Sequence, residues 1–253
     1  MPTLAYDDLC AIVRHLPKDL LRLMKEHQVW LAGGYIRARI THEPVSDIDL
    51  FSVSKDKCEL LARQLAEERK TKIYHTRNAF TVLAANYTPV QFIHRWTFDN
   101  PVELINSFDF TIARAAIWFD AETTSWCSVC DPNFYPDLAA KRLSYCAPAR
   151  VEEVGGSLLR VLKFARKGYF ISPEQLAGTI ARMLSHVCVG TPFWQGGEQH
   201  QQRVLAGLMR QVDPLTVIDG LRPSDDSFDA PVTAELEIST VSGVGKGGEV
   251  PLV

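Results

Sequence analysis

Apolar residues follow helical spacing in some segments of the first half of the chain and strand-like runs in others. Residues 6–27 carry apolar side chains three and four positions apart, which predicts one helix interrupted near Pro17. The same spacing predicts an amphipathic helix over residues 55–69. Short apolar runs between turn residues predict several strands. The predicted strands are 29–32, 47–53, 72–77, 80–87 and 90–96, the short helices are 35–40 and 101–106, and 110–119 is a strand or a helix leading into one.

The second half of the chain has helical character. The segments with this spacing are 137–143, 151–168, 173–189 and 199–208. From about residue 222 onward Ser, Asp, Pro, Gly and Val dominate, so we expect a mobile tail that packs no core. The pattern therefore predicts an α+β protein with a mixed domain over residues 1–132, an all-helical domain over 133–221 and a tail over 222–253.

Composition narrows the class of protein. Of the 253 residues 46% are hydrophobic, enough for a buried core, and the formal net charge is −3. A dedicated nucleic-acid-binding protein usually carries a broad positive surface, and this net charge does not indicate one. Any contact with nucleic acid must therefore be made by a local basic patch. The sequence shows no signal peptide and no apolar run of membrane-spanning length. Because the six cysteines are scattered, we expect a cytoplasmic protein with free thiols.

The pair Cys127 and Cys130 has the spacing of zinc ligands. No second pair of cysteines or histidines lies near it in the sequence. We therefore interpret the two cysteines as strand residues, one of which is buried.

Two short motifs indicate the chemistry. Gly33 and Gly34 end an apolar strand and open a helix, and a glycine turn of this kind offers backbone N–H groups to an anion such as phosphate. Asp47 and Asp49 are two positions apart in a strand, so both point to one side and Ile48 to the other. Neighbouring carboxylates favour a divalent metal with oxygen ligands, although an acidic pair facing solvent is the plain alternative. Together the motifs indicate nucleotidyl transfer.

The arrangement Gly33-Gly34-x-x-Arg37, followed by Asp47-x-Asp49, resembles the signature of the polymerase-beta-like nucleotidyltransferase superfamily. The segment from Asp109, which reads Asp-Phe-Thr-Ile-Ala-Arg-Ala, looks like the Arg-Arg-Asp-Phe-Thr-Ile-Asn-Ala motif of CCA-adding enzymes and bacterial poly(A) polymerases. Residues 159–169 resemble their neck helix, and the whole resemblance covers about residues 29–171. It implies a nucleotidyltransferase head, with a small mixed sheet flanked by helices, followed by a helical neck.

The resemblance also implies an NTP substrate and two Mg²⁺ ions bridged by Asp47 and Asp49, with Mn²⁺ as an alternative metal. Asp109 is the third expected catalytic residue, as a further carboxylate ligand or as a ribose contact; its plain alternative is an N-cap. The expected nucleotide-binding residues are Gly33, Gly34, Arg37, Arg95, Arg114, Arg160 and Lys163.

The basic residues of the neck-like helix form a stripe. Arg160, Lys163 and Lys167 share one helical face, which either lines the nucleotide cleft, meets the phosphates of an acceptor or faces solvent. Arg95 is expected to contact phosphate or to be a surface strand residue, and Trp96 to be a core residue or a base-stacking one.

Several positions depart from the CCA-adding branch. Ser107 and Phe108 replace the two arginines before Asp109, and Gln91 stands where the superfamily often has a third carboxylate. The Glu-Asp-x-x-Arg element, which in that branch pairs with base edges, falls at residues 153–157, which read Glu-Val-Gly-Gly-Ser. The sequence therefore does not predict specific CCA addition.

The resulting hypothesis is a metal-dependent nucleotidyltransferase that moves NMP from an NTP to an acceptor hydroxyl. The first candidate acceptor is an RNA or tRNA 3′ end, which the neck-like helix and its basic stripe favour. The second is a protein or a small molecule, which the short, acidic chain without the base-reading element favours. The third alternative is a non-catalytic nucleotide-binding subunit, and the presence of both Asp47 and Asp49 argues against it.

Overall fold

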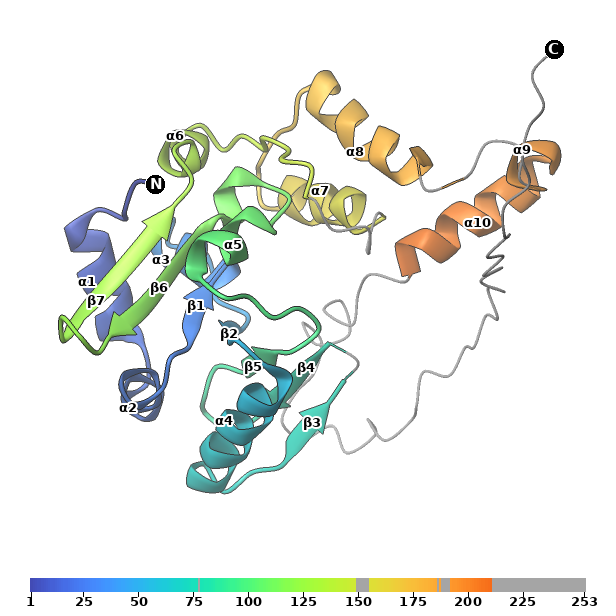
Figure 1. The fold of residues 1–253 in the computed structure, drawn as a ribbon. Coiled ribbons are helices and arrows are strands. Elements are labelled where there is room, and N and C mark those ends of the chain that lie inside the picture. Colours follow the sequence, from blue (N-terminus) through green and yellow to red (C-terminus); the bar gives the residue numbers. More distant parts are fainter. Residues whose placement is uncertain (77, 149–154, 186, 188–191, 211–253) are drawn as a thin grey trace, which may run out of the picture. The chain divides into compact units, whose positions relative to one another are not determined.

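A seven-stranded mixed sheet organises the first part of the chain (Figure 1). Its strand order is β3-β4-β5-β2-β1-β6-β7, and the β2–β5 pair is parallel whereas the other pairs are antiparallel. The strands are β1 (Trp30–Ala32), β2 (Ile48–Phe51), β3 (Ile73–His75), β4 (Ala79–Val82), β5 (Val90–Ile93), β6 (Ala115–Asp120) and β7 (Ser125–Cys130). The predicted small mixed sheet is confirmed.

The computed structural model describes residues 1–76, 78–148, 155–185, 187 and 192–210, which all belong to one unit of the chain, residues 1–223. The helices are α1 (Tyr6–His15), α2 (Lys18–Glu26), α3 (Gly34–Ile40), α4 (Lys55–Glu68), α5 (Pro101–Asn106), the 3₁₀ helix η1 (Thr111–Ala113), α6 (Phe134–Ala139), α7 (Gly156–Arg166), α8 (Pro173–Ser185), α9 (Pro192–Gln195) and α10 (Glu198–Arg210). Each helix in this part of the chain is too short or too polar to cross a membrane.

The order of elements follows the sequence pattern closely. The helix expected over residues 6–27 is interrupted at Pro17, and Cys127 and Cys130 lie in β7 with Cys130 buried. After β7 the described residues form helices, as predicted, apart from two isolated bridges. The domain boundaries at residues 132 and 221 stay predictions, and the tail over 222–253 lies outside the described residues.

Two helix positions differ from the prediction. The helix expected over residues 137–143 lies earlier, because Pro136 is tolerated in the first turn of α6 and Lys141 takes a left-handed φ of 48° that ends the helical path. The helix expected over 151–168 begins at Gly156 in the structure, and residues 151–154 lie outside the described part.

The two faces of the sheet bury different clusters. Leu31 of β1 packs into the main core with residues of α2 and α4, whereas Trp30 and Ala32 pack on the opposite face with Leu104 and Ile105 of α5. All three residues of β1 are almost fully buried. A strand buried on both faces in this way fixes the centre of the sheet, and β2, which carries the acidic motif, pairs directly with it.

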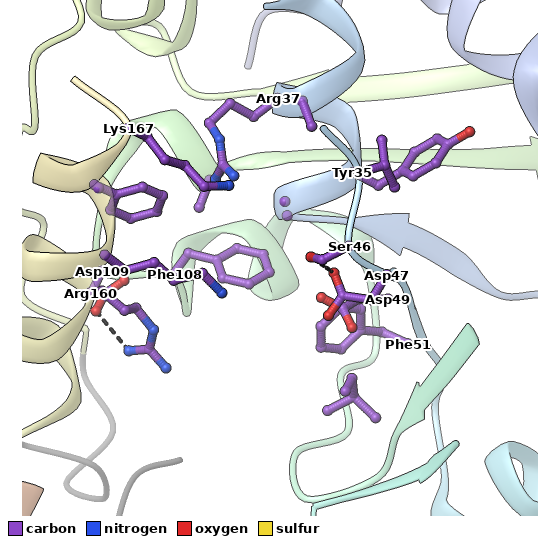
Figure 2. Close-up of a pocket in the computed structure, with 18 of the residues that line it drawn as sticks. Tyr35, Arg37, Ser46, Asp47, Asp49, Phe51, Phe108, Asp109, Arg160 and Lys167 are labelled. Carbon is purple, nitrogen blue, oxygen red and sulfur yellow. Dashed lines mark hydrogen bonds and ion pairs between the residues drawn. The ribbon is translucent and has the colours of Figure 1, made fainter. Parts of the chain in front are cut away.

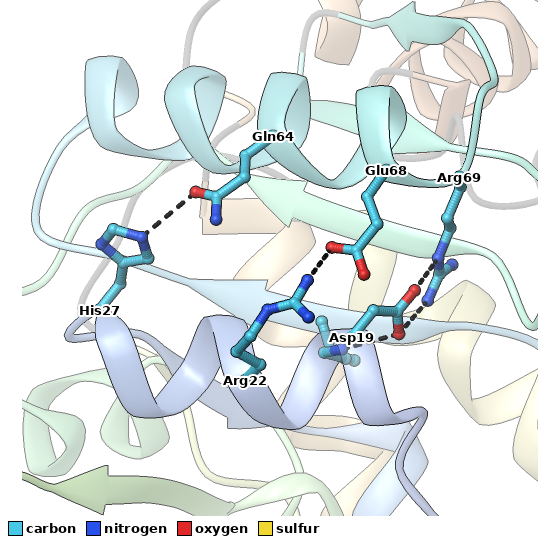
Figure 3. A network of polar contacts seen from close by, with 7 residues as sticks. Asp19, Arg22, His27, Gln64, Glu68 and Arg69 are labelled. Carbon is cyan, nitrogen blue, oxygen red and sulfur yellow. Dashed lines mark hydrogen bonds and ion pairs between the residues drawn. The ribbon is translucent and has the colours of Figure 1, made fainter.

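Ion pairs join α2 to α4 beside this core (Figure 3). The Arg69 guanidinium donates to Asp19 through Nε at 2.7 Å and through Nη2 at 3.2 Å, and the Arg69 side chain is only 1% exposed. Burial acts to raise the pKa of Asp19, but the hydrogen bonds from Arg69 outweigh it and hold that pKa below its usual value. The neighbouring pair of Arg22 and Glu68 is solvent-exposed.

This contrast gives a stability prediction. Replacing Asp19→Ala leaves the buried Arg69 charge without its partner, so we expect a loss of about 3 kcal/mol in the free energy of unfolding. Arg22→Ala breaks the exposed pair and should change stability far less, because water replaces the lost contact. Urea unfolding followed by circular dichroism measures both, and equal losses in the two variants would contradict the assignment.

Candidate active site

The two aspartates of the acidic motif stand side by side where β2 begins, Asp47 directly before its first residue and Asp49 within it (Figure 2). Ile48 between them is 1% exposed and belongs to the main core, whereas Asp47 and Asp49 line a cavity of about 170 Å³. The expected period-two arrangement is therefore present, and it leaves two carboxylates on the cavity side of the strand.

Gln91 occupies the position beside this pair. It lies on β5 opposite Asp49 in the parallel register and is 1% exposed. Its amide Nε2 donates to Asp47 Oδ2 at 3.0 Å, so the neutral side chain orients the carboxylate. The place expected for a third carboxylate is thus filled by a hydrogen-bond donor.

The glycine pair forms the next wall of the cavity, at the turn from β1 into α3. Gly33 has φ +79° and ψ −130°, a conformation that L side chains rarely adopt, and this is what requires glycine there. The Gly33 N–H donates to the Ala115 carbonyl oxygen at 3.3 Å, so it completes the sheet instead of facing the cavity. A Cβ on Gly34 would lie 3.8 Å from Arg37 Nη2, which shows that this guanidinium covers the turn.

Arg37 connects this turn to the neck-like helix. Its side chain is 6% exposed, and its guanidinium lies 4.8 Å from the ring centroid of Phe164 on α7. Arg37 Nε is also 3.5 Å from Glu43 Oε2. The arginine expected to reach a phosphate therefore lines the cavity, but a carboxylate already stands next to it.

Glu43 contacts residues that are far apart in the sequence. It accepts a hydrogen bond from the Tyr169 hydroxyl at 3.0 Å, and Lys167 Nζ lies 3.7 Å from its Oε2. We call Glu43, Arg37, Lys167 and Tyr169 the Glu43 cluster. Burial alone would raise the pKa of Glu43, but Arg37, the Tyr169 hydroxyl and Lys167 outweigh it and lower that pKa. The cluster holds α3 against the end of α7.

Asp109 lies on the other side of the cavity, away from the aspartate pair (Figure 2). It is 3% exposed, and Arg160 Nη1 donates to its Oδ2 at 2.8 Å. Among the described residues no group of three or more His, Cys, Asp or Glu side chains is placed to hold a metal ion. The catalytic role of Asp109 stays a prediction. The N-cap of η1 is Phe110, so the N-cap interpretation of Asp109 is wrong.

The basic stripe of α7 faces the cavity. Arg160, Lys163 and Lys167 all line it, together with Phe164 from the same helical face. Of the three interpretations of the stripe, the one in which it simply faces solvent does not hold for this structure. The cavity thus has an acidic wall on β2 and a basic wall on α7.

Arg95 and Arg114, both expected to bind nucleotide, are not part of this lining. Arg95 lies over the Trp96 ring at 4.8 Å from its centroid, and Arg95 Nη1 donates to Asn78 Oδ1 at 3.1 Å. Arg114 Nε donates to the Phe108 carbonyl at 2.9 Å, and Nη2 donates to the Asn106 carbonyl at 3.2 Å. These arginines support the segments beside the cavity.

Glu43 had no signal in the sequence. It sits in a turn outside any motif, and its partner Tyr169 is 126 positions later in the chain. The contact of Glu43 with Tyr169 becomes visible only when the fold is known.

Comparison with known proteins identifies the sequence relatives. A family model described as "Gabija anti-defense 2 family protein" matches residues 6–141, which is more than half of the chain. A relative from Bacillus phage SPbetaL7, named "Gabija anti-defense 2", is 26% identical over 161 residues. The match covers 64% of this chain but only 38% of the relative, so the chain spans well under half of that protein's length.

Solved structures share the fold. The Thermotoga maritima CCA-adding enzyme in complex with tRNA matches with a TM-score of 0.54 over 82% of this chain and 55% of that one, at 14% sequence identity. A CCA-adding enzyme in complex with CTP matches with a TM-score of 0.51 over 86% and 53% of the two chains, also at 14% identity. The chain thus shares the fold of these CCA-adding enzymes and spans about half the length of these structures.

The conformation of Gly33 gives a second prediction. Gly33→Ala should lower the free energy of unfolding by about 1–3 kcal/mol, because alanine is strained at this positive φ. Gly34→Ala is the matched control, since Gly34 is helical and its new Cβ would make only an ordinary contact with Arg37; its effect should stay within about 1 kcal/mol. Urea titration of both variants compares them, and an equal or larger loss in Gly34→Ala would refute the assignment.

The Glu43 cluster gives a pH-dependent prediction. At pH 7, Glu43→Gln should cost about 1–3 kcal/mol of stability, because it removes a charge-assisted hydrogen bond and two ion contacts. The folded pKa of Glu43 lies below its ordinary value of 4.5, so this contribution is fully present above 4.5 and disappears as pH falls through the lower folded value. The difference in unfolding free energy between the native protein and the variant should therefore shrink as the pH is lowered from 7 to 3.5. A difference independent of pH would contradict the role of the ionised carboxylate.

Proposed function

Because this chain belongs to the Gabija anti-defense 2 family, we propose that it acts in such anti-defense as a metal-dependent nucleotidyltransferase, moving NMP from an NTP to an acceptor hydroxyl. The observation that carries this proposal is the placement of Asp47 and Asp49 beside the Gly33–Gly34 turn, in one cavity of a fold shared with CCA-adding enzymes. The acidic wall and the facing basic wall suit a metal-bound triphosphate.

The cavity fits a divalent cation at the aspartate pair. Two carboxylates project from one face of β2, and the amide of Gln91 fixes the orientation of Asp47. Such oxygen ligands suit Mg²⁺, and Mn²⁺ is the alternative. A metal held there would supply Lewis-acid chemistry: it would lower the pKa of the acceptor hydroxyl and neutralise charge on the triphosphate.

The remaining residues would bind and orient the substrate. Arg37 covers the glycine turn, where the β- and γ-phosphates are expected, and Lys163 and Lys167 reach the same cavity from α7. Asp109, which accepts a hydrogen bond from Arg160, would contact the ribose. Attack on the α-phosphorus then depends mainly on positioning and on stabilisation of charge.

The first acceptor that we propose is an RNA 3′ end, including that of tRNA. The basic residues of α7 along one side of the cavity support it, since a local positive patch meets phosphates even on a chain with a net charge of −3. The second candidate is a protein acceptor, which the family's anti-defense description favours because a defence component is then the direct target. In either case the chemistry at the aspartate pair is the same.

The test is a panel of labelled NTPs with Mg²⁺, offered with total RNA or with protein extract. We expect label to enter RNA, and Asp47→Asn or Asp49→Asn to reduce incorporation more than about 100-fold while leaving the fold intact, because each removes a metal-binding carboxylate. Asp7→Asn, an exposed aspartate on α1, is the matched control and should keep full activity.

The outcomes separate the candidates. Label in protein instead of RNA would select the second acceptor. Full incorporation by both Asp47→Asn and Asp49→Asn, or no incorporation and no metal binding by the native protein, would overturn the proposed function.

A further inference from the structure

The cavity is lined by apolar side chains as well as by charged ones. Ile93, Trp96 and Phe108 line it and are only partly buried, so carbon surface faces the same space as the carboxylates and the basic residues. Apolar surface inside a charged cleft stays in water until a ligand covers it. An occupant with a charged part and a flat apolar part satisfies both kinds of wall.

Phe108 is the central apolar residue. Figure 2 shows its ring between the aspartate pair on one side and Asp109 with Arg160 on the other. The ring lies against the glycine turn, with Cζ 3.6 Å from the position of a Cβ on Gly33. It also packs edge-to-face on Phe51, with ring centroids 5.9 Å apart and an interplanar angle of 88°.

The backbone of this residue is held in place. The Phe108 carbonyl accepts from Arg114 Nε at 2.9 Å, and its N–H donates to the Ile105 carbonyl at 3.3 Å. Phe51 is in turn packed against Phe98, with ring centroids 6.2 Å apart. The ring is therefore fixed before any ligand arrives, which reduces the entropy lost on binding.

The two serine hydroxyls of the cavity are already engaged. Ser46 Oγ donates to Asp47 Oδ1 at 2.8 Å, and Ser107 Oγ donates to the Leu104 carbonyl at 2.7 Å. Asp109 is paired with Arg160. Within the described part of the chain, the lining has one further hydroxyl, that of Tyr35, and Figure 2 shows it pointing away from the Phe108 ring. Beside Phe108 the lining thus offers an aromatic face for a base, with both serine hydroxyls committed to protein partners instead of a base edge.

From this geometry we propose that Phe108 is the stacking platform for the base of the incoming NTP, and that the site accepts all four bases. The proposal rests on the proposed function and specifies its substrate. Stacking tolerates any base, because every base has a π face, and it favours purines modestly because they stack more strongly. Triphosphate and metal would be held by the charged walls, independently of Phe108.

Binding of nucleotides to the full-length chain in Mg²⁺ tests this without any acceptor. Isothermal titration should give dissociation constants for ATP, GTP, CTP and UTP within about tenfold of one another, each tighter than that of inorganic tripolyphosphate. Phe108→Leu, which keeps apolar volume, and Phe108→Ala should weaken all four NTPs, the alanine variant by about tenfold, and leave tripolyphosphate binding unchanged. Phe108→Tyr should restore binding.

Phe119→Ala is the matched control, because Phe119 packs edge-to-face on Trp126 and does not line the cavity. It should leave NTP binding unchanged. Two results would overturn the proposal although the native protein binds nucleotides. One is that Phe108→Ala weakens the binding of tripolyphosphate and of the NTPs equally; the other is that one NTP binds more than about 100-fold tighter than the rest. If neither NTPs nor tripolyphosphate bind the native protein, the proposed function fails and this proposal fails with it.

Discussion

The position of the cavity walls depends on the contacts that the Glu43 carboxylate makes. Arg37 belongs to α3, whereas Lys167 and Tyr169 follow α7, and the same carboxylate contacts all three. Without an anion at this point, two cations would face each other in a region where Arg37 is almost fully buried. One side chain from a turn therefore balances the charge between the walls that would enclose a triphosphate.

A second ion pair, Asp109 with Arg160, joins the same two parts of the chain on the other side of the cavity. The two contacts together fix the distance between the acidic and the basic wall. In both contacts, a carboxylate from before α7 meets a cation of α7 or of the residues that follow it. The neck-like helix is therefore held by charge as well as by the packing of Phe164 against Phe110.

The sequence predicted the sheet and the acidic motif well because both are local. Period two placed Asp47 and Asp49 on one face, and Pro17 marked the break between α1 and α2. Glu43 was not predicted, because two of its three partners, Lys167 and Tyr169, lie more than a hundred positions later in the chain. Arg114 illustrates the same limit. A basic residue in a nucleotidyltransferase-like motif suggested a phosphate contact, but the fold directs its guanidinium to two backbone carbonyls.

The pairing of β1 has a consequence for the order of folding during synthesis. Leu31 pairs with Leu50 on one side and with Ile117 on the other, and the Gly33 N–H is bonded to Ala115. The glycine turn is therefore made early in translation but remains at an open sheet edge until β6 leaves the ribosome, more than eighty residues later. Closure of such a distant contact is entropically expensive and slow. The nascent chain consequently carries both aspartates well before it has a site in which to use them.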